Sequence, residues 1–392
     1  MFRMKKIISD IIETSIRYGS MIGANCCVFR DGRELFGGSF GFSDRENNVP
    51  MSRDRIFRLF SLTKPITSAA VMILFDRGLL TPETEVADIF PEYAQLRYLC
   101  SDGKVRDFDG RLSVIELLTM TSGIPYANNF NKSVCAAGKL FDMVEDSIKE
   151  TGCGEVTTEQ FCKKAAEIPL SFRAGERWDY GISADILGGI VERVSGVKYG
   201  DFLRRNIFEP LGMKDTGFYV PRDKRSRLAG LYSWQDGKLV RDHNNYLGLT
   251  DYSEPPAFES GGAGLVSTID DYAKFACMLA NRGELDGVRI MSERAFSYMT
   301  SPKLTETQRA SMWDRLNGYN YGCLMRVMTD VEKSEIKTCN GEFGWDGWTG
   351  TYFCADAENR IAVLYFTQIC GAGTTYEASK ISTAVYDELT RK

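Results

Sequence analysis

A serine and a lysine stand one helical turn apart in Ser61-Leu62-Thr63-Lys64, directly before Pro65 and an apolar run. The chain holds a single histidine, His243, so a Ser-His-Asp hydrolase would depend on that one residue. A lysine can take the place of histidine as the base once burial or cationic neighbours lower its pKa toward neutrality. The pair therefore predicts acyl transfer through a serine nucleophile.

The Ser-x-x-Lys spacing occurs three more times, and its context separates the copies: Ser101/Lys104 in a polar turn, Ser195/Lys198 at a helix end, and Ser334/Lys337 in an alternating charged stretch. None of these opens a helix. After Ser61, apolar residues recur at helical spacing, and Pro65 is tolerated because it falls in the first turn. Ser61 is thus expected at a helix N-terminus, where free N–H groups and the positive dipole end favour an oxyanion. A serine N-cap followed by a surface lysine is the alternative for this segment taken by itself.

Composition limits the classes of protein. The chain has 392 residues, 43% of them hydrophobic and 26% charged, as is ordinary for a globular protein. A net charge of -5 gives no footprint for nucleic acid or anionic membrane, and no run approaches transmembrane length. The expected partner is a small-molecule ester or amide, and the sequence carries no signal for oligomeric state.

Cysteine and histidine usage indicates the compartment and the cofactors. The 11 cysteines, an odd number with no Cys-x-x-Cys pair, favour thiols in a reducing compartment over a disulfide framework. We therefore expect a cytoplasmic, bacterial-type setting. With one histidine and no clustered ligands, we expect no metal and no cofactor.

Strand patterns gather at both ends of the chain. Runs at 25–30 and 34–42 are joined by Asp31-Gly32, a hairpin signal, and later runs lie at 319–327, 336–341, 351–355 and 361–368. Helices are expected at 7–16 and 376–389, and the chain reads as mainly helical from 61 to about 285, with caps at Ser113, Ser183 and Thr268. This order predicts an α+β fold, with an antiparallel sheet flanked by terminal helices and an inserted mainly helical domain. We place the sheet domain at 1–60 plus 290–392, the helical domain at 61–289, and the site at their junction.

A second serine motif, Gly37-Gly38-Ser39-Phe40-Gly41, matches the nucleophile elbow Gly-x-Ser-x-Gly. That motif requires a strand, a sharp turn and a helix, with a histidine late in the chain. The segment reads instead as a glycine-rich strand, and no helical pattern follows before Ser61.

Six runs of residues, spread over nearly the whole chain, form a specific set: 57–67, 118–124, 210–217, 261–268, Trp178-Asp179-Tyr180 ahead of Asp185, and Gly344-Trp345-Asp346-Gly347 before a strand. Together they resemble the serine β-lactamase and penicillin-binding protein superfamily. Within it, the chain looks most like the class C β-lactamase-related, family VIII-like carboxylesterases and transesterases.

The resemblance implies roles for particular residues. Tyr180 stands opposite Ser61 and Lys64, and the lysine and tyrosine share the proton traffic as a coupled pair. The helix that Ser183 is expected to cap would favour a phenolate or a strongly polarised phenol at Tyr180, although a packed aromatic is the alternative. By analogy, the N–H groups of Ser61 and Trp348 form the oxyanion hole, and Gly347 keeps that backbone approachable.

Two departures from the β-lactamase pattern concern the substrate. Ile182 replaces the asparagine of Tyr-x-Asn, and Trp345-Asp346-Gly347 replaces Lys-Thr-Gly. A β-lactam carboxylate would lose its cationic partner and meet an acid. Our hypothesis is that Asp346 disfavours anionic substrates and favours amine-bearing ones.

These observations predict a serine hydrolase that forms an acyl-enzyme on Ser61, with carboxylesterase activity on small neutral or cationic acyl esters. The same residues would also serve a β-lactamase, or a peptidase or transesterase acting on D-amino acid derivatives. A slow-acylating sensor of the penicillin-binding type is the non-catalytic alternative.

Overall fold

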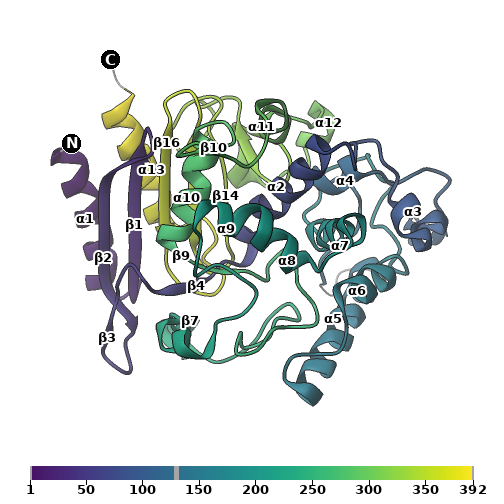
Figure 1. Cartoon of the computed structure of the whole chain (residues 1–392), viewed down its shortest axis with the longest axis horizontal. Coiled ribbons are helices and arrows are strands. Elements are labelled where there is room, and N and C mark those ends of the chain that lie inside the picture. Colours follow the sequence, from purple (N-terminus) through teal and green to yellow (C-terminus); the bar gives the residue numbers. More distant parts are fainter. Residues whose placement is uncertain (1, 128–131, 391–392) are drawn as a thin grey trace.

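The computed structural model describes residues 2–127 and 132–390, and its largest element in this part of the chain is an eight-stranded antiparallel sheet (Figure 1). In spatial order its strands are β12 (Tyr319–Tyr321), β13 (Arg326–Met328), β14 (Phe343–Asp346), β15 (Thr351–Asp356), β16 (Ile361–Phe366), β1 (Gly23–Arg30), β2 (Arg33–Asp44) and β3 (Val49–Pro50). At its centre, β16 pairs with β1, with Asn25 opposite Phe366. The two ends of the chain therefore build one sheet, as expected.

Helices cover both faces of the sheet (Figure 1). α1 (Phe2–Arg17) and α13 (Tyr376–Leu389) lie on the outer face, and α10 (Ile269–Ala280) lies on the inner face. Because side chains alternate along a strand, neighbouring residues of β1 enter different cores. Val28 packs with the outer helices, whereas Cys27 belongs to the larger core that continues into the helical part.

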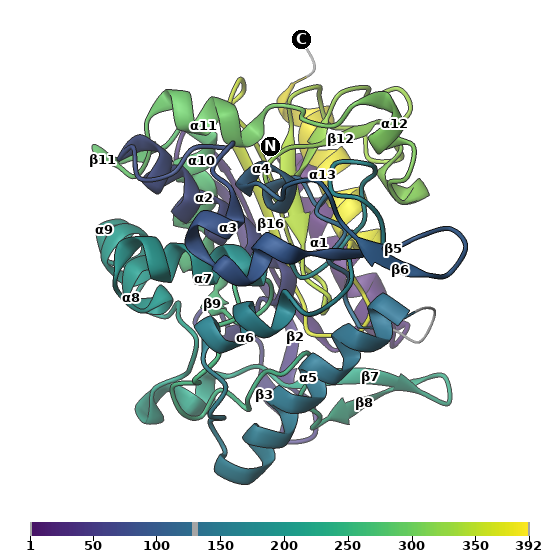
Figure 2. The same cartoon turned by 90° about the vertical axis from the view of Figure 1, so that its right-hand side faces the viewer.

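The helical part lies on the far side of α10 and surrounds α2 (Figures 1 and 2). Its helices are α2 (Thr63–Asp76), α3 (Val86–Ile89), α4 (Val114–Leu118), α5 (Lys132–Thr151), α6 (Thr158–Ala165), α7 (Ser183–Ser195), α8 (Tyr199–Leu203) and α9 (Glu209–Leu211), with α11 (Glu293–Thr300) and α12 (Glu306–Arg309) following later in the chain. Every residue of α2 from Thr63 to Leu74 is buried. This helix is therefore a core element rather than an amphipathic surface helix.

Short two-stranded ribbons complete the structure. They are β4 (Ile56–Arg58) with β9 (Val266–Thr268), β5 (Arg97–Leu99) with β6 (Val105–Asp107), β7 (Leu231–Gln235) with β8 (Lys238–Asp242), and β10 (Glu284–Leu285) with β11 (Val288–Arg289). The β4–β9 pair matters most for the site, because β4 leads directly into the segment that carries Ser61.

Several local predictions are confirmed. The hairpin between β1 and β2 turns at Asp31 (φ 51°) and Gly32 (φ 72°), the left-handed pair that a two-residue turn requires. Ser113 makes the predicted capping box, and the Thr268 side chain accepts from the amide of Asp271 at 3.1 Å. The elbow-like run at 37–41 lies within β2.

Other local predictions are wrong. The run 319–327 is not one strand, because Leu324 takes a left-handed φ of 57° between β12 and β13. The run 336–341 forms no strand, and the amide of Lys337 instead donates to Thr383 Oγ1 on α13 at 3.1 Å. Ser183 does not cap α7: it is the first residue of that helix, and its hydroxyl lies 2.8 Å from that of Ser122.

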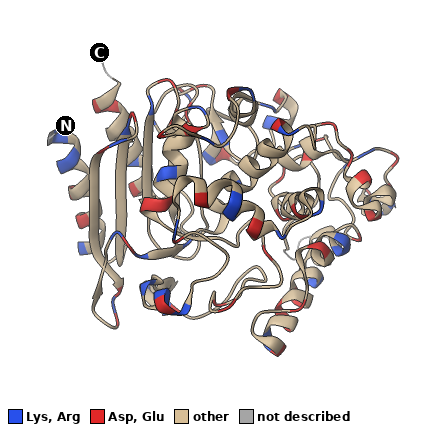
Figure 3. Ribbon diagram, viewed as in Figure 1, with Lys and Arg blue, Asp and Glu red and all other residues tan. Residues whose placement is uncertain are grey.

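Charge is spread over the whole chain, with acidic and basic residues interspersed on the helices (Figure 3). In the described ranges, none of the helices is both long enough and apolar enough to span a membrane. The division of the chain at residues 60 and 290 stays a prediction.

A buried ion pair lies within the sheet, where Arg326 Nη2 is 3.3 Å from Glu342 Oε1 with side-chain exposures of 2% and 0%. The same nitrogen donates to the hydroxyl of Tyr352 at 3.0 Å. Charges this deep depend on each other, because neither can be solvated by water.

Glu342→Ala should therefore lower the free energy of unfolding by about 3–5 kcal/mol, since it leaves the Arg326 charge buried and unpaired. Urea unfolding followed by tryptophan fluorescence measures this loss. The control is Lys333→Ala, which removes an exposed pair with Asp330 and should cost no more than about 1 kcal/mol. Equal losses in the two variants would contradict the assignment of a buried pair.

Candidate active site

The amine of Lys64 lies at the centre of a buried polar cluster. Its Nζ is 3.2 Å from Ser61 Oγ, 3.0 Å from the hydroxyl of Tyr126 and 2.8 Å from the carbonyl oxygen of Gly262. Lys64 is 0% exposed. A neutral amine has two N–H groups and one lone pair, which matches donation to Gly262 and Tyr126 and acceptance from the hydroxyl of Ser61.

Burial controls the protonation of Lys64. Desolvation lowers its pKa to about 7, and the carboxylates of Asp185 and Asp346 oppose this shift without cancelling it. Neutral lysine is therefore well populated at physiological pH, as a general base requires.

Ser61 is held by its backbone rather than by a cap. It lies in a short 3-10 turn, η1 (Phe60–Leu62), directly before α2, and the preceding Phe60 has a left-handed φ of 45°. The amide of Leu59 donates to the carbonyl of Leu265 at 2.9 Å, which continues the β4–β9 pairing up to the turn. Positive φ at a bulky residue costs of order 1–3 kcal/mol, so the surrounding contacts must enforce it.

The end of β14 provides one of those contacts. The hydroxyl of Thr351 donates to the carbonyl of Leu59 at 3.1 Å, and the amide of Gly347 donates to the carbonyl of Thr351 at 2.6 Å. A Cβ at position 347 would lie 2.2 Å from Leu59 O. Gly347 is thus needed for the close approach of β14 to the nucleophile segment.

Tyr180 lies beside the serine and lysine, as predicted. Its hydroxyl accepts a hydrogen bond from Trp345 Nε1 at 3.0 Å, and Lys64 Nζ is 4.7 Å from its ring centroid. Burial raises the pKa of Tyr180, and hydrogen bonds with Ser61 and Trp345 only partly oppose this. The expectation that a helix end would favour a phenolate is therefore not supported, because α7 begins three residues later and desolvation dominates.

Tyr126 is a residue of this cluster that the sequence reasoning missed. Its ring lies 5.7 Å from that of Tyr180, and burial raises the pKa of its phenol as well. Pro125 forms a β-bridge with Gly181, and a Cβ at position 181 would lie 1.9 Å from the carbonyl oxygen of Ile124. The signal in the sequence was thus Gly181, which permits this contact, together with a tyrosine two residues after Ile124.

Asp185 positions the carbonyl that Lys64 contacts. The carboxylate is 2% exposed, and its Oδ1 accepts from Ser260 Oγ at 2.5 Å and from the amide of Gly262 at 3.0 Å. Burial raises its pKa, although Lys64 opposes the shift. The glycine-rich turn after residue 260 is therefore pinned from below by α7.

The strand residues predicted to bind substrate fall into two groups. Trp345 is 1% exposed and stacks on Tyr180 with ring centroids 5.5 Å apart. Trp348 packs on Phe60 at 5.3 Å and on Tyr246 at 4.6 Å. Within the part of the chain that the structure describes, neither the amide of Ser61 nor that of Trp348 donates to another protein group, which leaves both available to an oxyanion.

Asp346 does not present a free negative charge. It is 7% exposed, and its Oδ2 accepts from Thr374 Oγ1 at 2.5 Å and lies 3.6 Å from Arg315 Nη1. Arg315 is 46% exposed and stacks on Trp313. The sequence argument treated Asp346 as uncompensated, but a cation from a loop thirty-one residues earlier accompanies it.

Other candidate groups lie elsewhere. His243 is exposed in a loop, and all 11 cysteines are free thiols. Over residues 2–127 and 132–390, no three His, Cys, Asp or Glu side chains are grouped to hold a metal ion.

Comparison with known proteins agrees with this geometry. The sequence model of the family described as Beta-lactamase matches residues 8–379. The chain belongs to the beta-lactamase family. Among the relatives of this beta-lactamase family protein, Protein Rv1367c of Mycobacterium tuberculosis (strain ATCC 25618 / H37Rv) is 31% identical over 365 residues, which cover 90% of this chain and 87% of that protein.

Two further relatives of this beta-lactamase family protein carry names that state an activity. Esterase EstB of Burkholderia gladioli is 27% identical, covering 94% of this chain and 90% of its own. The solved structure of "EstCE1, a hydrolase with promiscuous acyltransferase activity" superposes with a TM-score of 0.81 at 22% identity and covers 98% of both chains. At that identity the second likeness shows the β-lactamase-like fold.

The pKa of Lys64 is directly measurable. In protein labelled with [13Cε]lysine, the resonance that disappears in Lys64→Ala should titrate near pH 7, because burial disfavours the ammonium. An ordinary lysine titrates at about 10.4. A Lys64 resonance that titrates with the ordinary lysines would contradict a neutral base.

Proposed function

We propose that this protein is a serine hydrolase that forms an acyl-enzyme on Ser61 and acts as a carboxylesterase on small acyl esters. The observation that carries the proposal is the buried amine of Lys64, 3.2 Å from Ser61 Oγ, with its pKa lowered to about 7. A serine hydroxyl needs such a base within hydrogen-bond reach to become a nucleophile.

The contacts support a two-step reaction. The hydroxyl of Ser61 gives its proton to neutral Lys64 while Oγ bonds to the ester carbonyl carbon, and the N–H groups of Ser61 and Trp348 donate to the resulting oxyanion. When the intermediate collapses, the C–O bond to the alcohol breaks. The proton held by Lys64 then passes to the departing alkoxide, and the hydroxyl of Tyr180 lies beside Ser61 for this transfer. Water, deprotonated by Lys64, releases the acid and restores Ser61.

The hydroxyl of Tyr180 acts as a neutral donor and relay in this proposal. Burial raises the pKa of Tyr180, so a phenolate base is disfavoured. The indole N–H of Trp345 donates to the same oxygen at 3.0 Å and fixes its orientation. Tyr126 holds Lys64 from the other side through its hydroxyl.

Ester hydrolysis is favoured over β-lactam hydrolysis by the residues at the strand. Ile182 is fully buried and offers no amide to a β-lactam side chain, and Trp345 occupies the lysine position of Lys-Thr-Gly. The names of EstB and EstCE1 agree with an esterase. Transfer of the acyl group to an alcohol would use the same residues, with the alcohol in the place of water.

Ser61→Ala should reduce kcat/KM for p-nitrophenyl butyrate by about a thousandfold or more, because no other group can form the acyl bond. Product release and intact-protein mass are measured together, with a chromogenic cephalosporin in parallel. Wild type should cleave the ester and leave the cephalosporin largely intact. His243→Ala is the control and should keep full activity.

Three results would redirect the proposal. Unchanged turnover in Ser61→Ala would remove the nucleophile. A stable acyl adduct without turnover would indicate the sensor class, and rapid cephalosporin cleavage would indicate a β-lactamase.

The charge pair at the strand predicts substrate preference, and we propose neutral or cationic acyl groups. Asp346→Gly leaves Arg315 unpaired, so activity on the mono-p-nitrophenyl ester of succinate should rise relative to that of 4-aminobutyrate. We expect a change of about fivefold to tenfold, which corresponds to about 1 kcal/mol. Arg315→Ala should shift the ratio of kcat/KM in the opposite direction. An unchanged ratio in both variants would show that the pair does not face the acyl group.

A further inference from the structure

A second cavity of about 560 Å³ lies away from the Ser61 cluster. Its lining includes neither Ser61, Lys64, Tyr126 nor Tyr180. Its volume lies in the range of small-molecule sites, which span about 300–1,000 Å³. The family-like run 210–217 contributes residues 214–217 to its wall, and nothing in the proposed reaction uses them.

The cavity has fixed walls. One side is formed by α8 and the π-helical turn η3 (Arg204–Phe208), and the opposite side by residues 214–221. Gly217 pairs with Val266 of β9 in both directions, at 3.1 and 2.8 Å. The amide of Ala257 donates to the carbonyl of Cys153 at 3.1 Å, which ties the segment 255–257 to the end of α5.

Most of the wall is apolar. The residues that provide this surface are Phe208, Phe218, Tyr219, Val220, Pro255 and Pro256. The side chain of Tyr219 is 40% exposed, although it is a large aromatic group at the cavity. An apolar body inside the cavity would cover this exposed surface.

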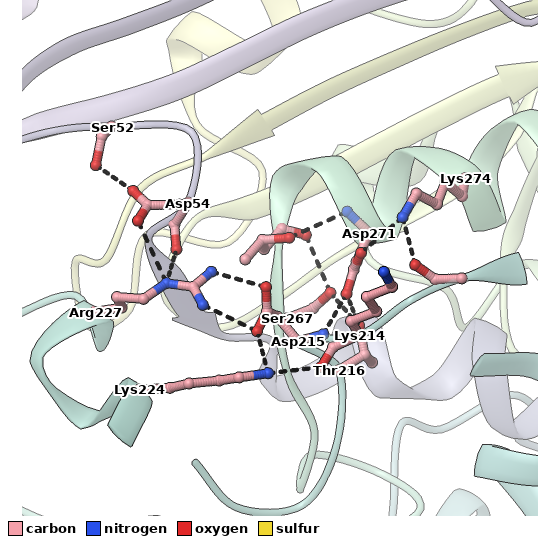
Figure 4. Close-up of polar contacts among 12 residues, drawn as sticks. Ser52, Asp54, Lys214, Asp215, Thr216, Lys224, Arg227, Ser267, Asp271 and Lys274 are labelled. Carbon is pink, nitrogen blue, oxygen red and sulfur yellow. Dashed lines mark hydrogen bonds and ion pairs between the residues drawn. The ribbon is translucent and has the colours of Figure 1, made fainter. Parts of the chain in front are cut away.

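Two lysines at the cavity lack a charged partner. In the ranges that the structure describes, neither Lys198 nor Lys214 forms an ion pair or donates a side-chain hydrogen bond. The other cations there are committed: Lys224 lies 2.8 Å from Asp215, which Arg227 also binds (Figure 4), and Arg204 lies 3.1 Å from Asp201. The charge left over at the cavity is therefore positive, in a chain whose net charge is -5.

The acid at the cavity, Glu259, opposes this positive charge only weakly. It accepts from the amide of Gly200 at 2.7 Å. Burial raises its pKa to about 7, with Glu192 and Asp201 acting in the same direction and Lys198 opposing them. Near neutral pH it is thus partly protonated and can donate its own O–H to an anion.

We propose that this cavity is a second binding site, separate from Ser61, for a small organic anion with an apolar body and one acidic group. The apolar wall takes the body, and Lys198 and Lys214 take the charge. The observations behind this site are independent of those behind the esterase proposal, so either can fail without the other.

Octanoate is the probe, and isothermal titration calorimetry measures its binding to protein whose Ser61 has first been blocked with a fluorophosphonate. Blocking removes the catalytic pocket from the measurement. Octanoate should still bind with one site per chain, and octanol, which lacks the charge, should bind about tenfold more weakly. Loss of octanoate binding on blocking Ser61 would overturn the proposal.

Two variants locate the site. In Gly217→Leu the new side chain has room, because a Cβ at 217 meets only Tyr219 O, at 3.9 Å, and it should fill the cavity and abolish binding. The double variant Lys198→Ala/Lys214→Ala should weaken octanoate about tenfold and leave octanol unchanged. Lys238→Ala, at an exposed lysine outside the cavity, is the matched control.

Ester turnover and thermal unfolding confirm that each variant is folded before titration. If Gly217→Leu does not fold, the double lysine variant decides the question by itself. Octanoate binding that is unchanged in the double variant would overturn the proposal, as would an equal loss in Lys238→Ala.

Discussion

The constraint on which the rest of the site depends is the complete burial of the Lys64 amine. Water would hold the ammonium at its ordinary pKa, and only the removal of water brings the pKa to about 7. The fold achieves this by placing α2 in the core with every residue from Thr63 to Leu74 buried. The polar atoms around the amine then satisfy its hydrogen bonds without neutralising the effect, because two of them belong to an uncharged phenol and a backbone carbonyl.

Close backbone contacts turn this base into a catalytic arrangement. The segment before Ser61 is clamped by β9 on one side and by the end of β14 on the other, and Phe60 is held in a left-handed conformation between them. The sheet and the helical part therefore meet at one short stretch of chain. Glycines at 181, 262 and 347 allow the approaches, since a Cβ at each would lie within 2.7 Å of a neighbouring atom.

The sequence predicts well what depends on local patterns. The Ser61 and Lys64 spacing, the Asp31-Gly32 hairpin and the terminal helix at 376–389 all follow from short-range rules, and the structure has them. What it could not give are contacts set by distant pairing. Tyr126 reaches Lys64 through a bridge between Pro125 and Gly181, and Arg315 reaches Asp346 from a separate loop.

Local rules also failed where tertiary contacts replaced them. Ser183 has the residue type of a cap, yet its hydroxyl is used by Ser122. The alternating stretch at 336–341 resembles a strand, but its backbone bonds to α13 instead of to a sheet neighbour. In both places a long-range partner satisfied the polar group that the local pattern assigned to regular structure.

The most direct test of the account is the pH dependence of the acylation step itself, with enzyme in excess over a p-nitrophenyl ester and the acyl-Ser61 adduct followed by rapid quench and mass. If neutral Lys64 is the base, the acylation rate should rise about tenfold per pH unit, and level off near pH 7. An acylation rate that keeps rising well above neutrality, toward the pKa of an ordinary lysine, would contradict the account.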